Sequence, residues 1–192
     1  YIEYVRFADD VVILVDAYHR HNWLLKGAER RLREELAKLR VEINEEKSRI
    51  VDLAKGETFS FLGFDFRRVR SLRGIWRPQY TPLPKKRTAL LSKFRDIFRR
   101  FASQPVTRVI ELINPILRGW VNYFAIGHSA RCFSFIKDWV EKKVRRHLMR
   151  ARKRKGFGWQ RWSRQWLYAK LGLFNQYMVQ RPEPMLKAVP AR

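Results

Sequence analysis

Residues 1–15 read YIEYVRFADDVVILV, two apolar runs separated by a pair of aspartates. Residues 1–7 and 11–15 are rich in β-branched and aromatic side chains, which favour strands. The interruption at Ala8, Asp9 and Asp10 is typical of a tight turn. The stretch therefore predicts an antiparallel hairpin that carries two adjacent carboxylates at its tip.

The two carboxylates allow two interpretations. A turn needs only one Asp or Asn, so a second carboxylate favours a Mg²⁺ site. Magnesium takes one or two carboxylates together with waters and substrate phosphates. The alternative is an ordinary hairpin turn that contains aspartate, and the spacing alone does not separate the two.

The chain after the hairpin alternates between helical and extended patterns. Apolar side chains at helical spacing predict a helix over residues 23–40. A polar turn at 44–48, a strand at 49–53 and an extended, alternating segment at 59–66 are then expected. Residues 77–84 contain three prolines, which should interrupt any regular element and mark a boundary.

The second part of the chain predicts a small helical bundle. Apolar residues fall on one face of residues 85–101, of a segment from about Val106, and of residues 133–148. Pro84 suits a first helical turn, and Pro115 predicts a kink or break at Asn114. The fold class is therefore α+β, with a hairpin, a helix and further strands followed by an all-α part.

Charge is distributed unevenly between these parts. The 192 residues carry a formal net charge of +24. Residues 1–84 hold 16 basic and 13 acidic side chains, whereas residues 85–192 hold 26 and 5. A polyanion, by default nucleic acid, is the expected partner of the second part. A basic solvated face with no particular partner, or a membrane-surface helix, are the alternatives.

Two absences exclude other classes of protein. No apolar run reaches the roughly 18–20 residues of a membrane span. The single cysteine, Cys132, excludes a disulfide framework and a multi-cysteine zinc site.

Residues 145–155 hold seven basic groups and precede Trp159, Trp162 and Trp166, which suit stacking on bases.

Three motifs resemble the palm of reverse transcriptases, and they occur in the expected order. The segment YVRFADD at residues 4–10 resembles the palm motif with paired aspartates, with Phe7 where Tyr is commoner. The segment VEINEEKS at 41–48 resembles the next palm motif, with its lysine at Lys47. The segment FLGF at 61–64 is similar to the element that grips the primer strand.

A fourth motif narrows the resemblance. The segment INPILRGWVNYF at residues 113–124 resembles the signature of the group II intron maturase-specific domain. Over residues 1–175 the chain thus resembles the C-terminal portion of a group II intron-encoded reverse transcriptase. This implies three regions: the end of the palm at 1–80, a maturase-specific helical thumb (domain X) at 81–155, and a basic, aromatic extension at 156–192 that is a candidate for nucleic-acid contact.

The resemblance also implies roles for residues near the hairpin. Mg²⁺ would be the cofactor, with Asp9 as a direct ligand and Asp10 as a ligand or a supporting acid. Lys47 would neutralise or protonate the leaving pyrophosphate, unless it is only a surface lysine at a turn. Phe7 and Ala8 would support the active site, and Phe7 is expected to pack beneath it. The expected primer grip is Phe61, Leu62, Gly63 and Phe64.

The expected RNA contacts lie in the second part. Asn122 has an alternative role in local capping or in bonding between helices. The full predicted set is Lys85, Lys86, Arg87, Arg118, Asn122, Tyr123, Arg145, Arg146, Arg150, Arg152, Lys153, Arg154 and Lys155. The implied partners are group II intron RNA, a DNA primer or target, and an N-terminal fingers and palm portion; no membrane is expected.

The resemblance implies an RNA-directed DNA polymerase that assists intron splicing and copies intron RNA into DNA during retrohoming. It would act in a bacterial cytoplasm and associate with the nucleoid when it acts on DNA. The chain begins with Tyr1, so we expect a fragment. It lacks the aspartate of an earlier palm strand, and we expect it to bind RNA without polymerising. The alternative is a non-catalytic splicing maturase or RNA chaperone. The absent strand should also leave an apolar face of the hairpin uncovered.

Overall fold

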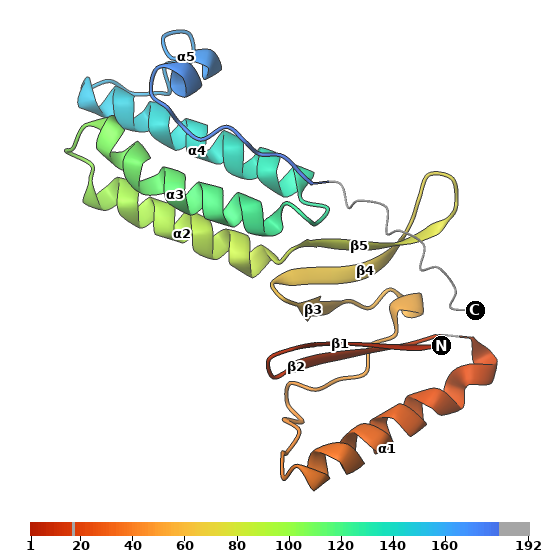
Figure 1. The fold of residues 1–192 in the computed structure, drawn as a ribbon. Coiled ribbons are helices and arrows are strands. Elements are labelled where there is room, and N and C mark those ends of the chain that lie inside the picture. Colours follow the sequence, from red (N-terminus) through yellow and green to blue (C-terminus); the bar gives the residue numbers. More distant parts are fainter. Residues whose placement is uncertain (17, 181–192) are drawn as a thin grey trace, which may run out of the picture. The chain divides into compact units, whose positions relative to one another are not determined.

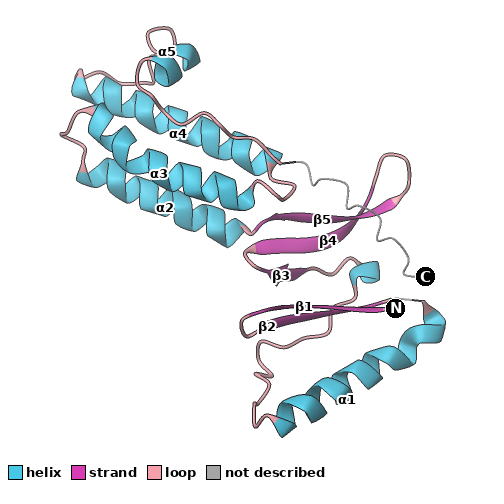
Figure 2. Ribbon diagram, in the orientation of Figure 1, coloured by secondary structure: helices cyan, strands magenta, loops and turns pink. Residues whose placement is uncertain are grey.

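The computed structural model describes residues 1–16 and 18–180. It is a mixed α+β fold, and Figure 2 shows its strands and helices by colour. Contacts divide the chain into two compact units. Unit 1 comprises residues 1–62 and 66–78, and unit 2 comprises residues 63–65 and the chain from Gln79 onward. No helix in the described residues is both long enough and apolar enough to cross a membrane.

Unit 1 begins with the predicted hairpin. Strands β1 (Ile2–Phe7) and β2 (Asp10–Val15) are antiparallel, and their register runs from Ile2 opposite Val15 to Phe7 opposite Asp10. This register leaves Ala8 and Asp9 as a two-residue turn, in which Ala8 adopts a φ of 53°. The prediction of a hairpin with both aspartates at its tip is confirmed.

The hairpin forms a sheet of two strands, and in the described chain no third strand joins it. None of the residues of β1 is buried. Large apolar side chains therefore remain exposed on both strands, namely Ile2, Tyr4, Val5, Phe7, Val11 and Leu14. The expectation of an uncovered apolar face is confirmed.

The predicted helix is α1 (Asn22–Lys38), which follows the short helix η1 (His19–His21). Arg33 on α1 forms ion pairs with Glu29 and with Glu45 in the following loop. The Glu45 hydrogen bond is the main cause of the raised pKa of Arg33. These contacts hold the loop beside the helix.

The predicted strand at residues 49–53 is wrong. The segment is a loop that ends in the short helix η2 (Leu53–Lys55). The Asp52 side chain accepts hydrogen bonds from the backbone N–H groups of Ala54 and Lys55, and the Asp52 N–H donates to Glu57. Local side-chain bonds thus replace the ladder that a strand would need.

Three strands form the second sheet, in the order β3 (Phe59–Phe61), β4 (Phe64–Arg70) and β5 (Trp76–Pro82). The alternating segment at 59–66 is therefore two strands rather than one. Leu62 and Gly63, with φ of 48° and 77°, form the turn between them. Two successive positive φ values suit a tight hairpin turn, which period-two hydrophobicity does not reveal.

The proline segment at 77–84 was expected to interrupt regular structure, and this expectation is wrong for its first half. Pro78 and Pro82 lie within β5. This strand is at the edge of its sheet, where a proline need not remove a hydrogen bond from the ladder. Pro84 begins the next helix, as predicted.

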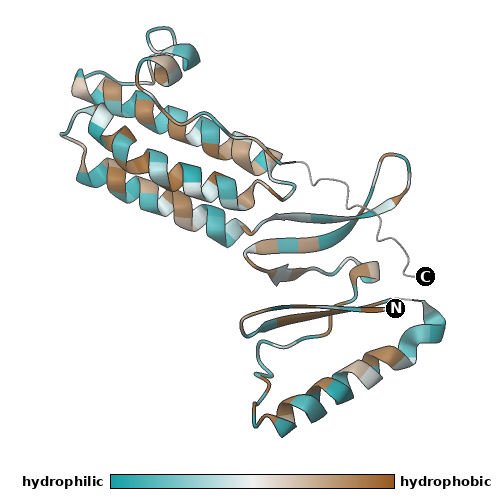
Figure 3. Ribbon diagram, viewed as in Figure 1, coloured by the Kyte–Doolittle hydropathy of each residue, from teal (hydrophilic) through white to brown (hydrophobic). Residues whose placement is uncertain are grey.

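Unit 2 is the predicted helical bundle. Its helices α2 (Pro84–Arg100), α3 (Val106–Phe124) and α4 (Ala130–Ala151) lie side by side and pack on one another (Figure 1). Hydrophobic and hydrophilic positions are interspersed along each helix (Figure 3), as an amphipathic pattern requires. The core includes Phe94, Phe98, Val109, Ile113, Leu117, Val121, Phe133, Ile136, Val140 and Val144.

Helix α3 continues through Pro115, so of the predicted kink or break at Asn114 the break is wrong. Ile113 and Leu117 on either side are fully buried, and this packing holds the helix together around the proline. Asn114 instead binds a distant segment. Its Nδ2 donates to the carbonyl of Gly172 over 2.8 Å, and its Oδ1 accepts from the Phe174 N–H over 2.9 Å.

The segment after α4 covers the bundle. It contains the short helix α5 (Arg164–Ala169) and then runs back along α3 and α4 (Figure 1). Trp162, Leu167, Leu173 and Phe174 are buried. Near its described end, the Gln180 N–H donates to the carbonyl of Ala125. The segment is therefore part of the fold of unit 2.

Candidate nucleic-acid interface

The aspartate pair lies at an exposed turn. Asp9 is in the turn and Asp10 is the first residue of β2, and both are exposed. The Arg6 Nε donates to the Ala8 carbonyl over 2.8 Å, which braces the turn. Phe7 is 61% exposed, so the expectation that it packs beneath the site is wrong for this structure. Among the described residues no further strand joins the hairpin to give Phe7 a layer to pack against.

The donor set at this turn fits one magnesium ion in part. Two carboxylates can hold Mg²⁺ when waters and substrate phosphates supply the other ligands. In the described residues, no group of three His, Cys, Asp or Glu side chains is placed to hold a metal. A two-metal centre would therefore need a further carboxylate in addition to Asp9 and Asp10.

Lys47 lies in a separate turn. Its N–H donates to the carbonyl of Asn44 over 3.1 Å and to the Asn44 side chain over 3.2 Å. Within residues 1–16 and 18–180, no hydrogen bond or ion pair joins Lys47 to Asp9 or Asp10. Its catalytic role remains a prediction.

The FLGF segment is divided between two environments. Phe64 is buried in unit 2, where its ring meets Phe124 at 5.0 Å and Tyr80 at 5.9 Å between centroids. The Gly63 carbonyl accepts a hydrogen bond from the Leu83 N–H. Phe61 and Leu62 are half-buried. Phe64 is thus part of the packed interior of unit 2.

Helix α3 presents the polar residues of its signature on the surface. Arg118 and Asn122, one turn apart, are both exposed. In the described chain the Asn122 side chain makes no hydrogen bond, so its alternative capping role finds no support. Tyr123 is half-exposed, and its ring packs edge-on against Phe124. Buried apolar residues thus hold this helix while Arg118 and Asn122 remain accessible.

Many basic side chains of unit 2 are exposed. Among the described residues, none of the exposed members of the predicted set pairs with a carboxylate. They are Lys85, Lys86, Arg118, Arg146, Arg150, Arg152, Lys153, Arg154 and Lys155. Burial and the nearby charges of Arg146, Arg95 and Arg150 lower the pKa of Lys143. Arg87 is half-buried, with its guanidinium 4.8 Å from the Phe135 ring.

Arg145 corrects one member of the predicted RNA-binding set. It is only 2% exposed. Its Nη1 lies 3.2 Å from Glu141, and its Nε donates to the carbonyl of Trp162 over 2.9 Å. A buried guanidinium without a carboxylate would be very costly, so this pair is structural. Trp162, expected to stack on bases, is buried beside it.

Glu141 is the centre of this cluster and was not among the predicted site residues. It is 1% exposed and accepts hydrogen bonds from Arg145, Arg164 and the Tyr168 hydroxyl. Burial alone would raise the pKa of Glu141, but these hydrogen bonds outweigh it and lower the pKa. Burial and the Glu141 carboxylate raise the pKa of Tyr168. A lone glutamate four residues before an arginine, in a basic helix, was the available signal.

Comparison with known proteins identifies one part of the chain. Residues 87–166 match the family model of the group II intron, maturase-specific domain. No curated protein matches the chain. The match runs from α2 through α3 and α4 into α5, and so covers the basic bundle. It supports the view that this part of the chain is similar to the C-terminal region of a group II intron maturase or reverse transcriptase.

Proposed function

We propose that the chain is the C-terminal part of an RNA-directed DNA polymerase that binds group II intron RNA, assists its splicing and copies it into DNA. The match of residues 87–166 to the maturase-specific domain carries this proposal. The chain would work with a fingers and palm portion and with a DNA primer or target, in the bacterial cytoplasm and at the nucleoid.

RNA binding would rest on unit 2. The exposed basic residues of the predicted RNA-binding set are free of carboxylate partners within the described chain, so each is available to a phosphate. Neutralising phosphates releases counterions, which makes affinity fall steeply with salt. Arg118 and Asn122 on α3 would add polar contacts to riboses or bases. The packed core holds these groups in place before RNA arrives.

The catalytic contribution of unit 1 would be partial. Asp9 and Asp10 would hold magnesium, which activates the primer 3′-hydroxyl and stabilises the leaving pyrophosphate when bound. A further carboxylate would come from the palm portion. Lys47 would come near the pyrophosphate only in the assembled enzyme. On its own, the chain is expected to bind RNA without extending a primer.

A non-catalytic splicing maturase is the second candidate. The observation in its favour is the contrast between a well-packed bundle and an aspartate turn that no third carboxylate of the described residues joins. In this case Asp9 would contribute nothing to activity in any assembly. Primer extension by the chain combined with its palm portion, compared with Asp9→Asn, separates the two candidates.

Binding to RNA tests the shared part of both candidates. We expect the chain to bind a group II intron RNA more tightly than an RNA of equal length without intron structure. Affinity should fall steeply with salt, and splicing of the intron in low magnesium should improve. Asp9→Asn is the matched control, because it should leave binding unchanged. Equal affinity for both RNAs, together with no effect on splicing, would contradict the proposal.

A further inference from the structure

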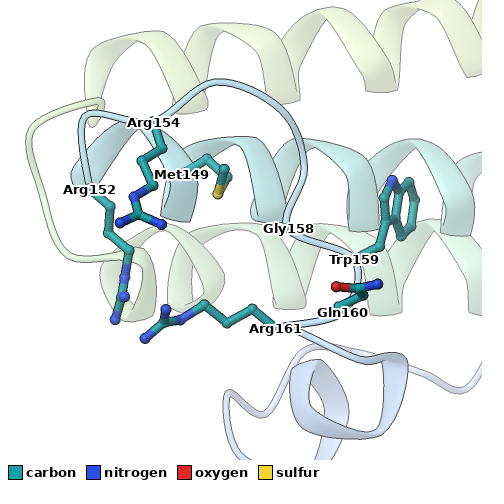
Figure 4. Close-up of a pocket in the computed structure, with 7 residues that line it drawn as sticks. All are labelled: Met149, Arg152, Arg154, Gly158, Trp159, Gln160 and Arg161. Atoms are coloured by element: carbon teal, nitrogen blue, oxygen red, sulfur yellow. The ribbon is translucent and has the colours of Figure 1, made fainter.

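A pocket of about 480 Å³ lies in the loop between α4 and α5. It is lined by Met149, Arg152, Arg154, Gly158, Trp159, Gln160 and Arg161. In the view of Figure 4, the three guanidinium groups lie toward one end of the pocket, and Trp159 and Gln160 lie at the other. Cationic donors and an aromatic ring thus share one cavity.

Trp159 has the properties of a stacking platform. The Arg145 guanidinium lies 4.3 Å from the centre of its ring. Arg145 is itself fixed by Glu141 and the Trp162 carbonyl. The Trp159 side chain is nevertheless 50% exposed. The Phe157 ring also lies 5.6 Å from the Trp159 ring, measured between centroids. A ring that is held by two side chains and is still half-exposed can accept a planar group without much further ordering.

The loop is built to hold this ring in place. Gly158 adopts a φ of +62°, and a Cβ at this position would lie 2.7 Å from the Trp162 ring. Trp162 is a buried core residue. Only glycine therefore fits between Trp162 and the pocket. The preceding turn also uses a positive φ at Lys153 and at Gly156.

The three arginines supply unneutralised charge. In the described part of the chain, none of Arg152, Arg154 and Arg161 forms an ion pair. Arg164, by contrast, pairs with both Glu141 and Asp138. Guanidinium groups without carboxylate partners are well suited to a phosphate, which they can bind through two parallel hydrogen bonds.

We infer that this pocket binds one unpaired nucleotide of an RNA strand, with its phosphate among the three arginines and its base stacked on Trp159. The Gln160 amide lies within the same pocket and offers both a donor and an acceptor to the base edge. The inference rests on the proposed RNA-binding function and adds a site to it. The loop after α4 would then bind a specific part of the RNA rather than only attract RNA by its positive charge.

Trp76 offers a matched control for Trp159. It is also 50% exposed, and Arg68 lies 4.6 Å from its ring. It lies in unit 1, outside the pocket. Trp159→Ala and Trp76→Ala therefore each remove a half-exposed tryptophan that stacks on an arginine. The two variants differ in whether the tryptophan lies in the pocket.

The test compares two labelled oligonucleotides of about 12 nucleotides, an adenosine RNA and an abasic chain with the same phosphates. The full chain should bind the adenosine RNA about 5- to 150-fold more tightly by anisotropy. Trp159→Ala should remove most of this preference and leave the abasic affinity unchanged. Trp159→Phe should retain part of it, and Trp76→Ala should retain all of it. Arg161→Gln should weaken both complexes.

Three results would overturn the inference. Equal affinity of the unaltered chain for both oligonucleotides would exclude base stacking, even if intron RNA still binds with a steep salt dependence. Equal losses in Trp159→Ala and Trp76→Ala would exclude this pocket. If adenosine monophosphate alone binds as tightly as the oligonucleotide, the ligand of the pocket would be a free nucleotide and not an RNA strand. Failure of intron RNA itself to bind would instead contradict the proposed function.

Discussion

The hairpin of unit 1 and the bundle of unit 2 differ in how much of their apolar surface is buried. In β1 and β2, aromatic and branched side chains remain exposed because two strands cannot cover both of their faces. In α2, α3 and α4, similar side chains are fully buried among three helices and the segment that follows them. The bundle has the packing of an independent unit, whereas the hairpin presents a surface suited to a partner.

The largest expected effect is the loss of stability caused by a substitution in the core of the bundle. Phe94 is fully buried, so Phe94→Ala should lower the free energy of unfolding by about 3–5 kcal/mol. The matched variant Phe7→Ala removes the same side chain from an exposed site and should change it by less than about 0.5 kcal/mol. Urea unfolding followed by helical circular dichroism measures both. Equal losses would show that the hairpin is packed as well as the bundle.

The next effect concerns the buried ion pair. Glu141→Gln keeps the volume but leaves Arg145 buried without a carboxylate, which should cost about 3 kcal/mol. The exposed pair offers the comparison: Asp96→Asn removes the partner of Arg99 and should cost less than about 1 kcal/mol. Thermal unfolding of the two variants measures the difference, and an Asp96 effect as large as the Glu141 effect would contradict it.

Glu141 also predicts an acid dependence. Its pKa is lower in the folded chain than the ordinary 4.5, so the ionised group stabilises the fold above the unfolded pKa. This stability is lost as pH falls through 4.5 toward the folded pKa. In Glu141→Gln this part of the loss should be absent. Urea midpoints measured from about pH 6 to pH 3 check the sign, and parallel profiles for the two proteins would contradict the assignment.

Substitutions of two asparagines on α3 should affect stability and RNA binding differently. Asn114→Ala removes both hydrogen bonds to residues 172 and 174 and should cost about 1–3 kcal/mol of stability. Asn122→Ala, on the exposed surface, should leave stability unchanged and weaken RNA binding. Unfolding of both variants measures the change in stability, and RNA titration of both measures the change in affinity. Loss of stability in Asn122→Ala would restore its alternative structural role.

The smallest expected effect compares one charge in each unit. Arg118 is exposed without a carboxylate partner among the described residues, so Arg118→Gln should reduce the slope of log affinity against log salt by about one. Arg31 on α1 pairs with Glu35, and Arg31→Gln should leave the slope unchanged. Titration of intron RNA at several salt concentrations measures both. A similar change in both variants would place RNA contacts on unit 1 as well.

Sequence patterns predicted the elements whose contacts are local. The hairpin at 1–15 and the three long helices follow from hydrophobic periodicity, and Pro84 marked a helix start. At the end of the strand expected at 49–53, the Asp52 side chain caps the short helix η2 and the Asp52 N–H bonds to Glu57, so local bonds form there instead of a strand ladder. The turn at Leu62 and Gly63 was hidden, because two positive φ values leave no mark on an apolar alternation.

Features that depend on distant residues were harder to predict. Arg145 looked like the other arginines of its run, because its partner carbonyl at Trp162 is 17 residues away. Glu141 takes partners from residues 164 and 168, across the loop that forms the pocket. Composition predicted a basic surface, but only the fold separates the arginines that hold the bundle together from those that remain available.

The contrast between a closed bundle that binds RNA and an open hairpin is best measured by hydrogen exchange of the full chain, with and without group II intron RNA. Without RNA, amides of α2, α3 and α4 should exchange slowly and those of β1 and β2 quickly, because only the bundle has a closed core. With RNA, added protection should appear on α3, α4 and residues 152–161. Uniform protection of both units without RNA, or protection by RNA confined to residues 1–78, would contradict the account.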